Sequence, residues 1–283
     1  MQFRRFSILL TLFWLGLFVL VPHLLVVLTS VMTPDSEHLA VWPVSGESWY
    51  RLREHLYLQV FWQSLWLSGI TTLICLLVGY PFAFIIAKLP RLWRGVLLFL
   101  MIVPFWTNSL IRTYAIKLIL GNKGLVNSLL LGLGIVDEPV QLLYTEFAVI
   151  FGLVYVLLPF MVLPLVSGFD KLDESLLEAA RDLGAGFWQR FRLIILPLPG
   201  VIAGSLIVFL PAMGMFYVAD LLGGAKNLLL GNIIKNQFLV VRNWPFGSAF
   251  SVALILIMAL LMWLYFIANR RINRQGGLQD ESL

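Results

Sequence analysis

Charged residues are scarce in this sequence. Only 12% of its 283 residues are Asp, Glu, Lys or Arg, and 60% are hydrophobic, whereas soluble domains carry about 25% charged residues. So few charges cannot give a fold of this size the polar surface that water requires. Ordinary soluble classes are therefore excluded, and the chain belongs in a lipid bilayer.

Cysteine, histidine and catalytic motifs are scarce too. Cys75 is the single cysteine, so no intramolecular disulfide is possible. His23, His38 and His55 lack the paired spacing of metal ligands, and we expect no metal site. No Gly-Lys dipeptide occurs, which excludes a Walker A loop, and neither H-E-x-x-H nor G-x-S-x-G is present. We expect a chain that is not an enzyme and binds no cofactor itself.

Long apolar runs are abundant. A membrane-spanning helix needs about 20 mostly apolar residues, because its backbone polar groups must bond within the segment. We predict an all-α membrane protein with six transmembrane helices, at residues 8–31, 60–87, 96–116, 147–166, 200–219 and 247–268. The first run is too long for a signal peptide and no A-x-A-like cleavage site follows it, so we expect it to be retained.

Two of these spans carry features that disturb a straight helix. The second is longer than a bilayer requires, and we expect it to tilt or to bend near Gly79 and Pro81. The third loses its purely apolar character near Trp106, and Asn108 and Arg112 follow at a depth where polar groups are costly.

The distribution of Lys and Arg predicts the orientation. With the N-terminus in the cytoplasm, twelve of these residues lie inside and eight outside, so both termini are expected to be cytoplasmic. The net charge of +5 then reflects topology and contact with membrane lipid. We expect no nucleic-acid binding, since no aromatic-rich basic patch lies outside the spans. Residues 1–59 would form the first span and first outer loop, 60–268 the other five spans, and 269–283 a cytoplasmic tail.

One polar segment interrupts the apolar chain between the fourth and fifth spans. The residues DESLLEAARDL, which begin at Asp173, have helical periodicity, with Asp173 as a candidate N-cap. Gly184 is placed to end this helix in a left-handed cap, and a second helical piece, GFWQRFRLIIL, extends to Pro197. From periodicity alone, an amphipathic helix on the membrane surface is the common interpretation.

The spacing within this segment is more specific than that. It resembles, position for position, the EAA loop of permease subunits in ATP-binding-cassette (ABC) importers. The matching residues are Glu178, Ala179, Ala180, Gly184, Ile194, Leu196 and Pro197. The resemblance implies that this cytoplasmic loop docks on a separate ATPase subunit, which holds ATP and Mg²⁺. Small residues would allow close helix approach, Glu178 offers a charge, and Gly184 sets the bend.

Other stretches resemble the polyamine permeases of this family. They are PFWTNSLIRTYA from Pro104, GNKGLVN from Gly121, LLPFMVLPL from Leu157, PAMGMFYVADLLGGAKNLLLGNIIKNQF from Pro211 and WPFGSAFS from Trp244. The resemblance implies transport of spermidine and putrescine across the bacterial inner membrane. It also implies a heterodimer with a second, related permease, two copies of an ABC ATPase and a periplasmic substrate-binding protein.

A polyamine carries several ammonium groups, so its pathway needs carboxylates, carbonyls or aromatic faces. In the fifth span Pro211 and Gly214 interrupt the helix. The candidate pathway residues that follow them are Asp220, Tyr217 and Phe216, and those of the third span are Trp106 and Asn108. Each has an alternative role at the membrane interface. Arg112 has the wrong charge for a cation site and is better suited to pair with a carboxylate.

Two other functions are consistent with parts of this sequence. A permease for another small solute, such as an organic cation or an amino acid, would carry the same EAA loop, because that loop concerns coupling and not cargo. A secondary transporter that works without an ATPase would have comparable spans but no use for the loop.

Overall fold

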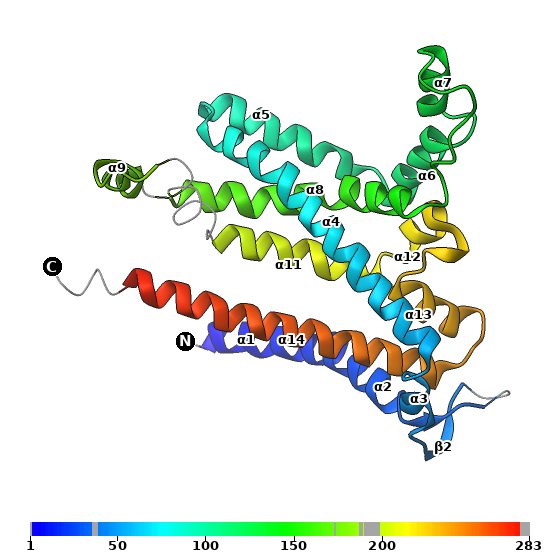
Figure 1. Cartoon of the computed structure of the whole chain (residues 1–283). Helices are drawn as coiled ribbons and strands as arrows, with labels where there is room; N and C mark the ends of the chain where they lie inside the picture. The colour runs from blue at the N-terminus through cyan, green and yellow to red at the C-terminus, as the bar shows by residue number, and fades with distance from the viewer. Residues whose placement is uncertain (1, 36–38, 173, 187–188, 190–198, 278–283) are drawn as a thin grey trace. The chain divides into compact units, whose positions relative to one another are not determined.

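The computed structural model describes residues 2–35, 39–172, 174–186, 189 and 199–277. The described residues are mostly helical, and Figure 1 gives the order of the elements. The chain divides into two compact units. One holds residues 1–62 and 230–259, and the other holds 63–229 and 260–283. Helices α4 (His55–Lys88) and α14 (Trp244–Gly277) contribute to both.

The first unit contains a long apolar helical run near the N-terminus and a set of aromatic contacts between α4 and α14. Its other elements are α1 (Gln2–Leu15), η1 (Gly16–Leu20), α2 (Val21–Thr29), the antiparallel strands β1 (Met32–Thr33) and β2 (Val41–Val44), α3 (Glu47–Arg51) and α13 (Leu230–Leu239). Tyr57 on α4 meets the rings of Phe246 and Phe250 on α14 edge-on, with centroids 4.9 and 5.3 Å away. These contacts join the first turns of α4 and α14.

The second unit is organised around α8 (Glu146–Asp170). Its other elements are α5 (Arg91–Ile102), η2 (Val103–Trp106), α6 (Ser109–Leu120), α7 (Leu125–Gly132), α9 (Glu174–Asp182), α11 (Pro199–Gly214), α12 (Phe216–Val218), η4 (Ala219–Gly223) and η5 (Gly224–Lys226). Half of the most apolar stretch of α8 is buried. Leu153, Leu157, Met161 and Leu165 lie at its centre with at most 1% exposure.

Glycines allow α11 to lie against α8. A Cβ atom on Gly200 would lie 2.4 Å from the carbonyl oxygen of Pro164, and one on Gly204 would lie 2.8 Å from the Met161 sulfur. The two glycines are four residues apart, so they share one helix face. Because lipid supplies no hydrophobic drive between helices, such close backbone approach is how helices gain packing energy in a membrane.

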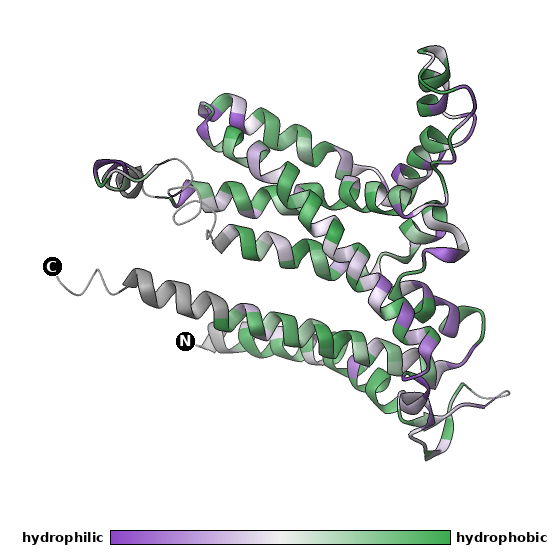
Figure 2. Cartoon of the chain, in the orientation of Figure 1, coloured by the Kyte–Doolittle hydropathy of each residue, from purple (hydrophilic) through white to green (hydrophobic). Residues whose placement is uncertain are grey.

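Within the described residues, four helices are each long and apolar enough to cross a membrane, at Phe6–Thr29, His55–Lys88, Glu146–Asp170 and Trp244–Ile267. The number reaches six if each of two bent helix pairs is counted as one span. Figure 2 shows the apolar residues running along these helices and the hydrophilic ones gathering at their ends and in the connections. Helix α4 covers the whole second predicted span and continues through Gly79 and Pro81, where the sequence predicts a tilt or a bend. A Cβ on Gly79 would lie 3.3 Å from Met161, so this glycine serves packing against α8.

The third predicted span, residues 96–116, is not one straight helix. Helix α5 leads into η2, and the pair Arg91–Trp106 and Ser109–Gly132 is bent by 92°. Asn108 starts a new helix here, since its Oδ1 accepts a hydrogen bond from the Leu110 N–H at 2.8 Å. The fifth span also bends, by 58°. That bend follows Gly214, one of the two residues that the sequence marks as an interruption.

Candidate functional site

Helix α9, the candidate for coupling, is followed by a glycine cap of the kind that the sequence predicts. Gly184 has φ = +77°. Its N–H donates to the carbonyl of Arg181 at 2.9 Å, and the N–H of Ala185 donates to the carbonyl of Ala180 at 2.9 Å. This bond pair is a Schellman motif, which satisfies two of the carbonyls left open at a helix end. The predicted left-handed cap at Gly184 is confirmed.

Most of the described side chains of α9 are exposed. Glu178 and Ala179 are exposed and Ala180 is partly buried. Leu183, which the periodicity places on the apolar face, is 88% exposed. Figure 1 shows α9 beyond the end of α8. The described part of this segment thus exposes an acid and an alanine on α9 and a large apolar side chain one residue after the helix. Ile194, Leu196, Pro197 and the candidate cap Asp173 lie outside the described residues.

At the first bend, two of the candidate pathway residues have different surroundings. Trp106 is 74% exposed and meets the Phe99 ring edge-on at 5.7 Å. Asn108 uses its side-chain oxygen to cap α6. The Arg112 guanidinium lies over the Phe105 ring, with Cζ 4.8 Å from the centroid. Trp106 is therefore free to offer a ring face to a cation, whereas Asn108 already has a structural role.

The second bend carries the other three candidates within two short elements. Phe216 and Tyr217 open α12 with their rings at right angles, 6.1 Å apart. Asp220 lies in the first turn of η4 and is exposed. Helix α6 packs against both α12 and η4. Helix α6, which Asn108 caps, is thus a neighbour of the elements that carry Phe216, Tyr217 and Asp220, although it is about 100 residues from them in the sequence.

The connection between α6 and α8 is held by residues to which the sequence analysis gave no role. Asn127 is fully buried. Its Nδ2 donates to the carbonyls of Gly121 and Val140 at 3.2 and 3.0 Å, and its Oδ1 accepts from the Val140 N–H at 2.9 Å. The Tyr144 N–H donates to the carbonyl of Leu222 in η4 at 2.8 Å. The stretch GNKGLVN contains this asparagine, but its spacing alone does not reveal the partner at position 140.

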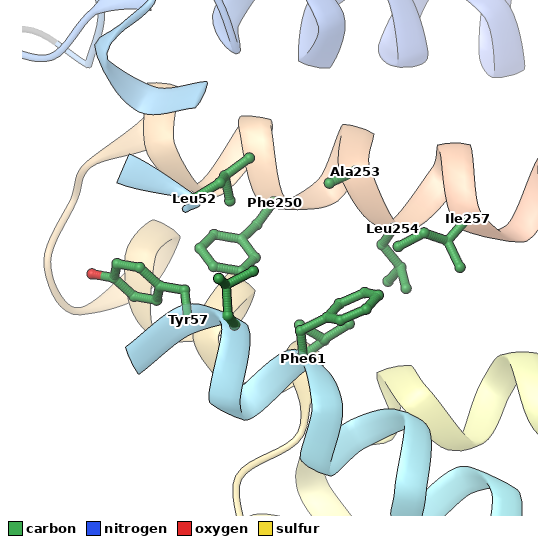
Figure 3. A pocket seen from close by; sticks show the side chains of 9 residues that line it. Leu52, Tyr57, Phe61, Phe250, Ala253, Leu254 and Ile257 are labelled. Atoms are coloured by element: carbon green, nitrogen blue, oxygen red, sulfur yellow. The ribbon is translucent and has the colours of Figure 1, made fainter. Parts of the chain in front are cut away.

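A pocket of about 180 Å³ lies in the first unit. Figure 3 shows side chains of α4 and α14 around it, with the Tyr57 hydroxyl directed away from the cavity. Its lining is Leu52, Tyr57, Leu58, Phe61, Leu230, Phe250, Ala253, Leu254 and Ile257. No carboxylate is among these residues, so the pocket offers an ammonium ion nothing beyond ring faces. Among the described residues there is also no cluster of three or more His, Cys, Asp or Glu that could hold a metal.

Comparisons with known proteins identify the family. Residues 79–274 match the model of the binding-protein-dependent transport system inner membrane component. The chain is 55% identical to the spermidine/putrescine transport system permease protein PotB of Haemophilus influenzae, and the alignment covers 98% of each chain. It is 53% identical to PotB of Escherichia coli K12, over 94% of this chain and 98% of that one.

Solved structures show the same fold at low sequence identity. A bacterial ABC transporter that imports the acidic polysaccharide alginate has a chain with a TM-score of 0.69 and 16% identity, over 96% of both chains. A bacterial alginate ABC transporter in complex with a pentasaccharide-bound periplasmic protein gives a TM-score of 0.72 and 17% identity, over 96% of this chain and 95% of that one. At such identities the likeness concerns the fold and not the cargo.

Proposed function

We propose that this chain, which belongs to the family of binding-protein-dependent transport system inner membrane components, is the permease subunit of an ATP-driven importer of spermidine and putrescine. The observation that carries the proposal is the 53–55% identity to PotB permeases over almost the whole chain. Alignments of this length cover the segments on both sides of the membrane. They therefore include both the proposed coupling loop and the region proposed to meet the cargo.

The proposed topology has six spans and two cytoplasmic termini. Each bent pair counts as one span, and the excess of Lys and Arg on the N-terminal side of the membrane supports the orientation. In this arrangement α9 lies in the cytoplasm, and the bends after Trp106 and Gly214 lie toward the periplasm. A hydrophilic helix such as α9 costs little in water.

Coupling is assigned to α9. Its exposed Glu178, small Ala179 and Schellman cap suit it to a cleft of a separate ATPase, which would bind ATP and Mg²⁺ and hydrolyse the nucleotide. Two ATPase copies, a second related permease and a periplasmic substrate-binding protein complete the proposed complex. The two permeases would share the pathway between them, so each supplies half of its wall.

The proposed pathway residues bind the ammonium groups of the cargo by noncovalent attraction and carry out no reaction on it. Asp220 offers a carboxylate to an ammonium group. Trp106, Tyr217 and Phe216 offer ring faces, each worth about 0.5–2 kcal/mol depending on desolvation. Asn108 contributes by fixing the bend beside Trp106. Binding must be weak enough to release the cargo, and several modest contacts satisfy that requirement better than one strong site.

Reconstitution tests the proposed function directly. We expect vesicles that contain the chain with its second permease and ATPase to take up labelled spermidine when ATP and the loaded binding protein are supplied. Vesicles with this chain alone should show no uptake under an ion gradient. Gradient-driven uptake by the chain alone would contradict the importer assignment. Stimulation of ATP hydrolysis by an amino acid instead of a polyamine would contradict the cargo.

A further inference from the structure

An ion pair fixes the base of the coupling loop. Asp170 is the last residue of α8, and Arg94 lies in the first turn of α5. Arg94 Nη1 donates to Asp170 Oδ1 at 2.7 Å, and Nη2 donates to Oδ2. The contact is therefore bidentate, which adds a fixed direction to its strength. Both side chains are about one-third exposed, at 31% and 33%, so the pair is partly shielded from water.

An aromatic cluster adjoins the ion pair. Phe169, which is buried, meets the rings of Tyr80 and Phe84 edge-on, with centroids 5.2 and 5.5 Å away. The Lys88 ammonium lies 4.4 Å above the Phe84 ring. The end of α8 is thus packed against the end of α4 by apolar contact and tied to the start of α5 by the ion pair.

Few residues separate this junction from the coupling helix. Helix α9 begins at Glu174, four residues after Asp170. Between them the N–H groups of Lys171 and Leu172 bond back to the carbonyls of Gly168 and Phe169, each at 3.2 Å. Leu172 also packs on the core of the second unit. Lys171 and Leu172 are thus held to the end of α8, and a displacement of α9 has few residues over which to be absorbed before it reaches α8.

We propose that the Arg94–Asp170 pair is a positioning device for coupling: it passes the displacement of α9 to α5, and through α5 and η2 to the bend beside Trp106. The inference rests on the proposed coupling role of α9. An exposed, monodentate surface pair contributes little and would fix no direction. Here both carboxylate oxygens are held, so α5 must follow the end of α8 as long as the pair persists.

Four variants of the assembled complex test this role. Asp170→Asn and Arg94→Gln each remove one charge of the pair. The double variant Arg94→Asp with Asp170→Arg restores a pair with reversed polarity. Arg91→Gln is the matched control, because Arg91 is an exposed arginine one turn earlier on α5. The readout is the number of spermidine molecules imported per ATP hydrolysed, in nanodiscs or vesicles with equal amounts of assembled complex.

We expect each single variant to lower the transport-to-hydrolysis ratio by about fivefold or more, the lower end of the range for coupling between sites. The double variant should recover most of the ratio, and Arg91→Gln should leave it unchanged. A pair that merely stabilises the fold would lower the amount of complex and leave the ratio alone. Unchanged ratios in both single variants, or a double variant as poor as the singles, would overturn the inference.

A parallel variant separates this inference from the proposed function. If Glu178→Arg uncouples the complex while the Asp170 and Arg94 variants do not, α9 couples but the ion pair does not transmit, and the inference alone fails. If Glu178→Arg also leaves the ratio unchanged, the coupling role of α9 fails and the inference fails with it.

Discussion

Gly184 caps α9, the proposed coupling helix, and its substitution tests the cost of one backbone conformation. Its φ of +77° lies in the left-handed region, which costs an L-residue about 1–2 kcal/mol. A Cβ built on Gly184 would meet no atom of the described residues within 4 Å, so the penalty expected for Gly184→Ala is conformational. The cap should therefore open roughly 5- to 30-fold more often, which is that energy expressed as an equilibrium ratio.

Hydrogen exchange at the cap measures this opening. The N–H groups of Gly184 and Ala185 donate the two bonds of the motif, so in the alanine variant the amides at positions 184 and 185 should exchange faster by that factor. Gly184→Asn should fall between wild type and alanine, because asparagine tolerates the left-handed region. Gly184→Pro fixes φ near about −65° and removes the N–H, so it should abolish spermidine uptake.

A nearby glycine supplies the control. Gly186 does not have a positive φ, and among the described residues its Cβ would meet only the Gln189 side chain, at 4.0 Å. In Gly186→Ala, the amides at positions 184 and 185 should therefore exchange at the wild-type rate, and spermidine uptake should be unchanged. Exchange in Gly184→Ala at the wild-type rate, or an asparagine variant as open as the alanine one, would refute the idea that this position needs glycine for its backbone conformation.

Three further predictions concern the docking face, the pathway and the core. Glu178→Arg reverses the exposed charge of α9 and should abolish ATP-driven uptake while the amount of chain in the membrane, measured by immunoblot, is unchanged. Asp220→Asn should lower spermidine uptake in the full complex by about tenfold, as expected for loss of a hydrogen bond to a charged group, and unchanged uptake would remove Asp220 from the pathway. Gly200→Ala places a Cβ 2.4 Å from the Pro164 carbonyl and should destabilise the chain by about 1–3 kcal/mol. Thermal unfolding in detergent measures this change, and Gly69→Ala, where a Cβ meets nothing within 4 Å, should not lower stability.

The residues within and directly after α9 were enough to predict this helix and its end. The end of α9 follows from a glycine after an amphipathic stretch, since few other residues reach positive φ without strain. The bend after Gly214 follows in the same way from a glycine and a proline inside an apolar run. The bend at Asn108 was harder, because hydropathy registers one polar residue but not whether its side chain caps a new helix.

Contacts between distant residues were not predictable from the sequence. Arg94 and Asp170 are 76 residues apart, and each is an ordinary charged residue at the end of an apolar run. The predicted fourth span ends at residue 166, whereas α8 continues to Asp170. That extension of about one turn brings the carboxylate to Arg94. Only the packing of α4 and α5 against α8 makes the two side chains meet.

Two helices lead from the proposed coupling loop toward the two bends, and the size of the effect expected from the ion pair depends on both of them. Helix α11 has 16 residues, or about 24 Å at 1.5 Å per residue. It follows the loop directly and ends at the bend after Gly214. Helix α5 starts at the ion pair and leads through η2 to the bend at Trp106.

Loss of the ion pair releases only the second of these connections. Helix α11 stays held to α8 where Gly200 lies against Pro164, and on the proposed mechanism it is moved together with α8. Removing the Arg94–Asp170 pair should therefore reduce coupling without abolishing it, whereas reversing Glu178 removes the contact that would move both helices. On the proposed mechanism, Asp170→Asn should retain some transport because one of the two helical connections remains. Glu178→Arg should retain none because it removes the contact with the ATPase that would move both helices.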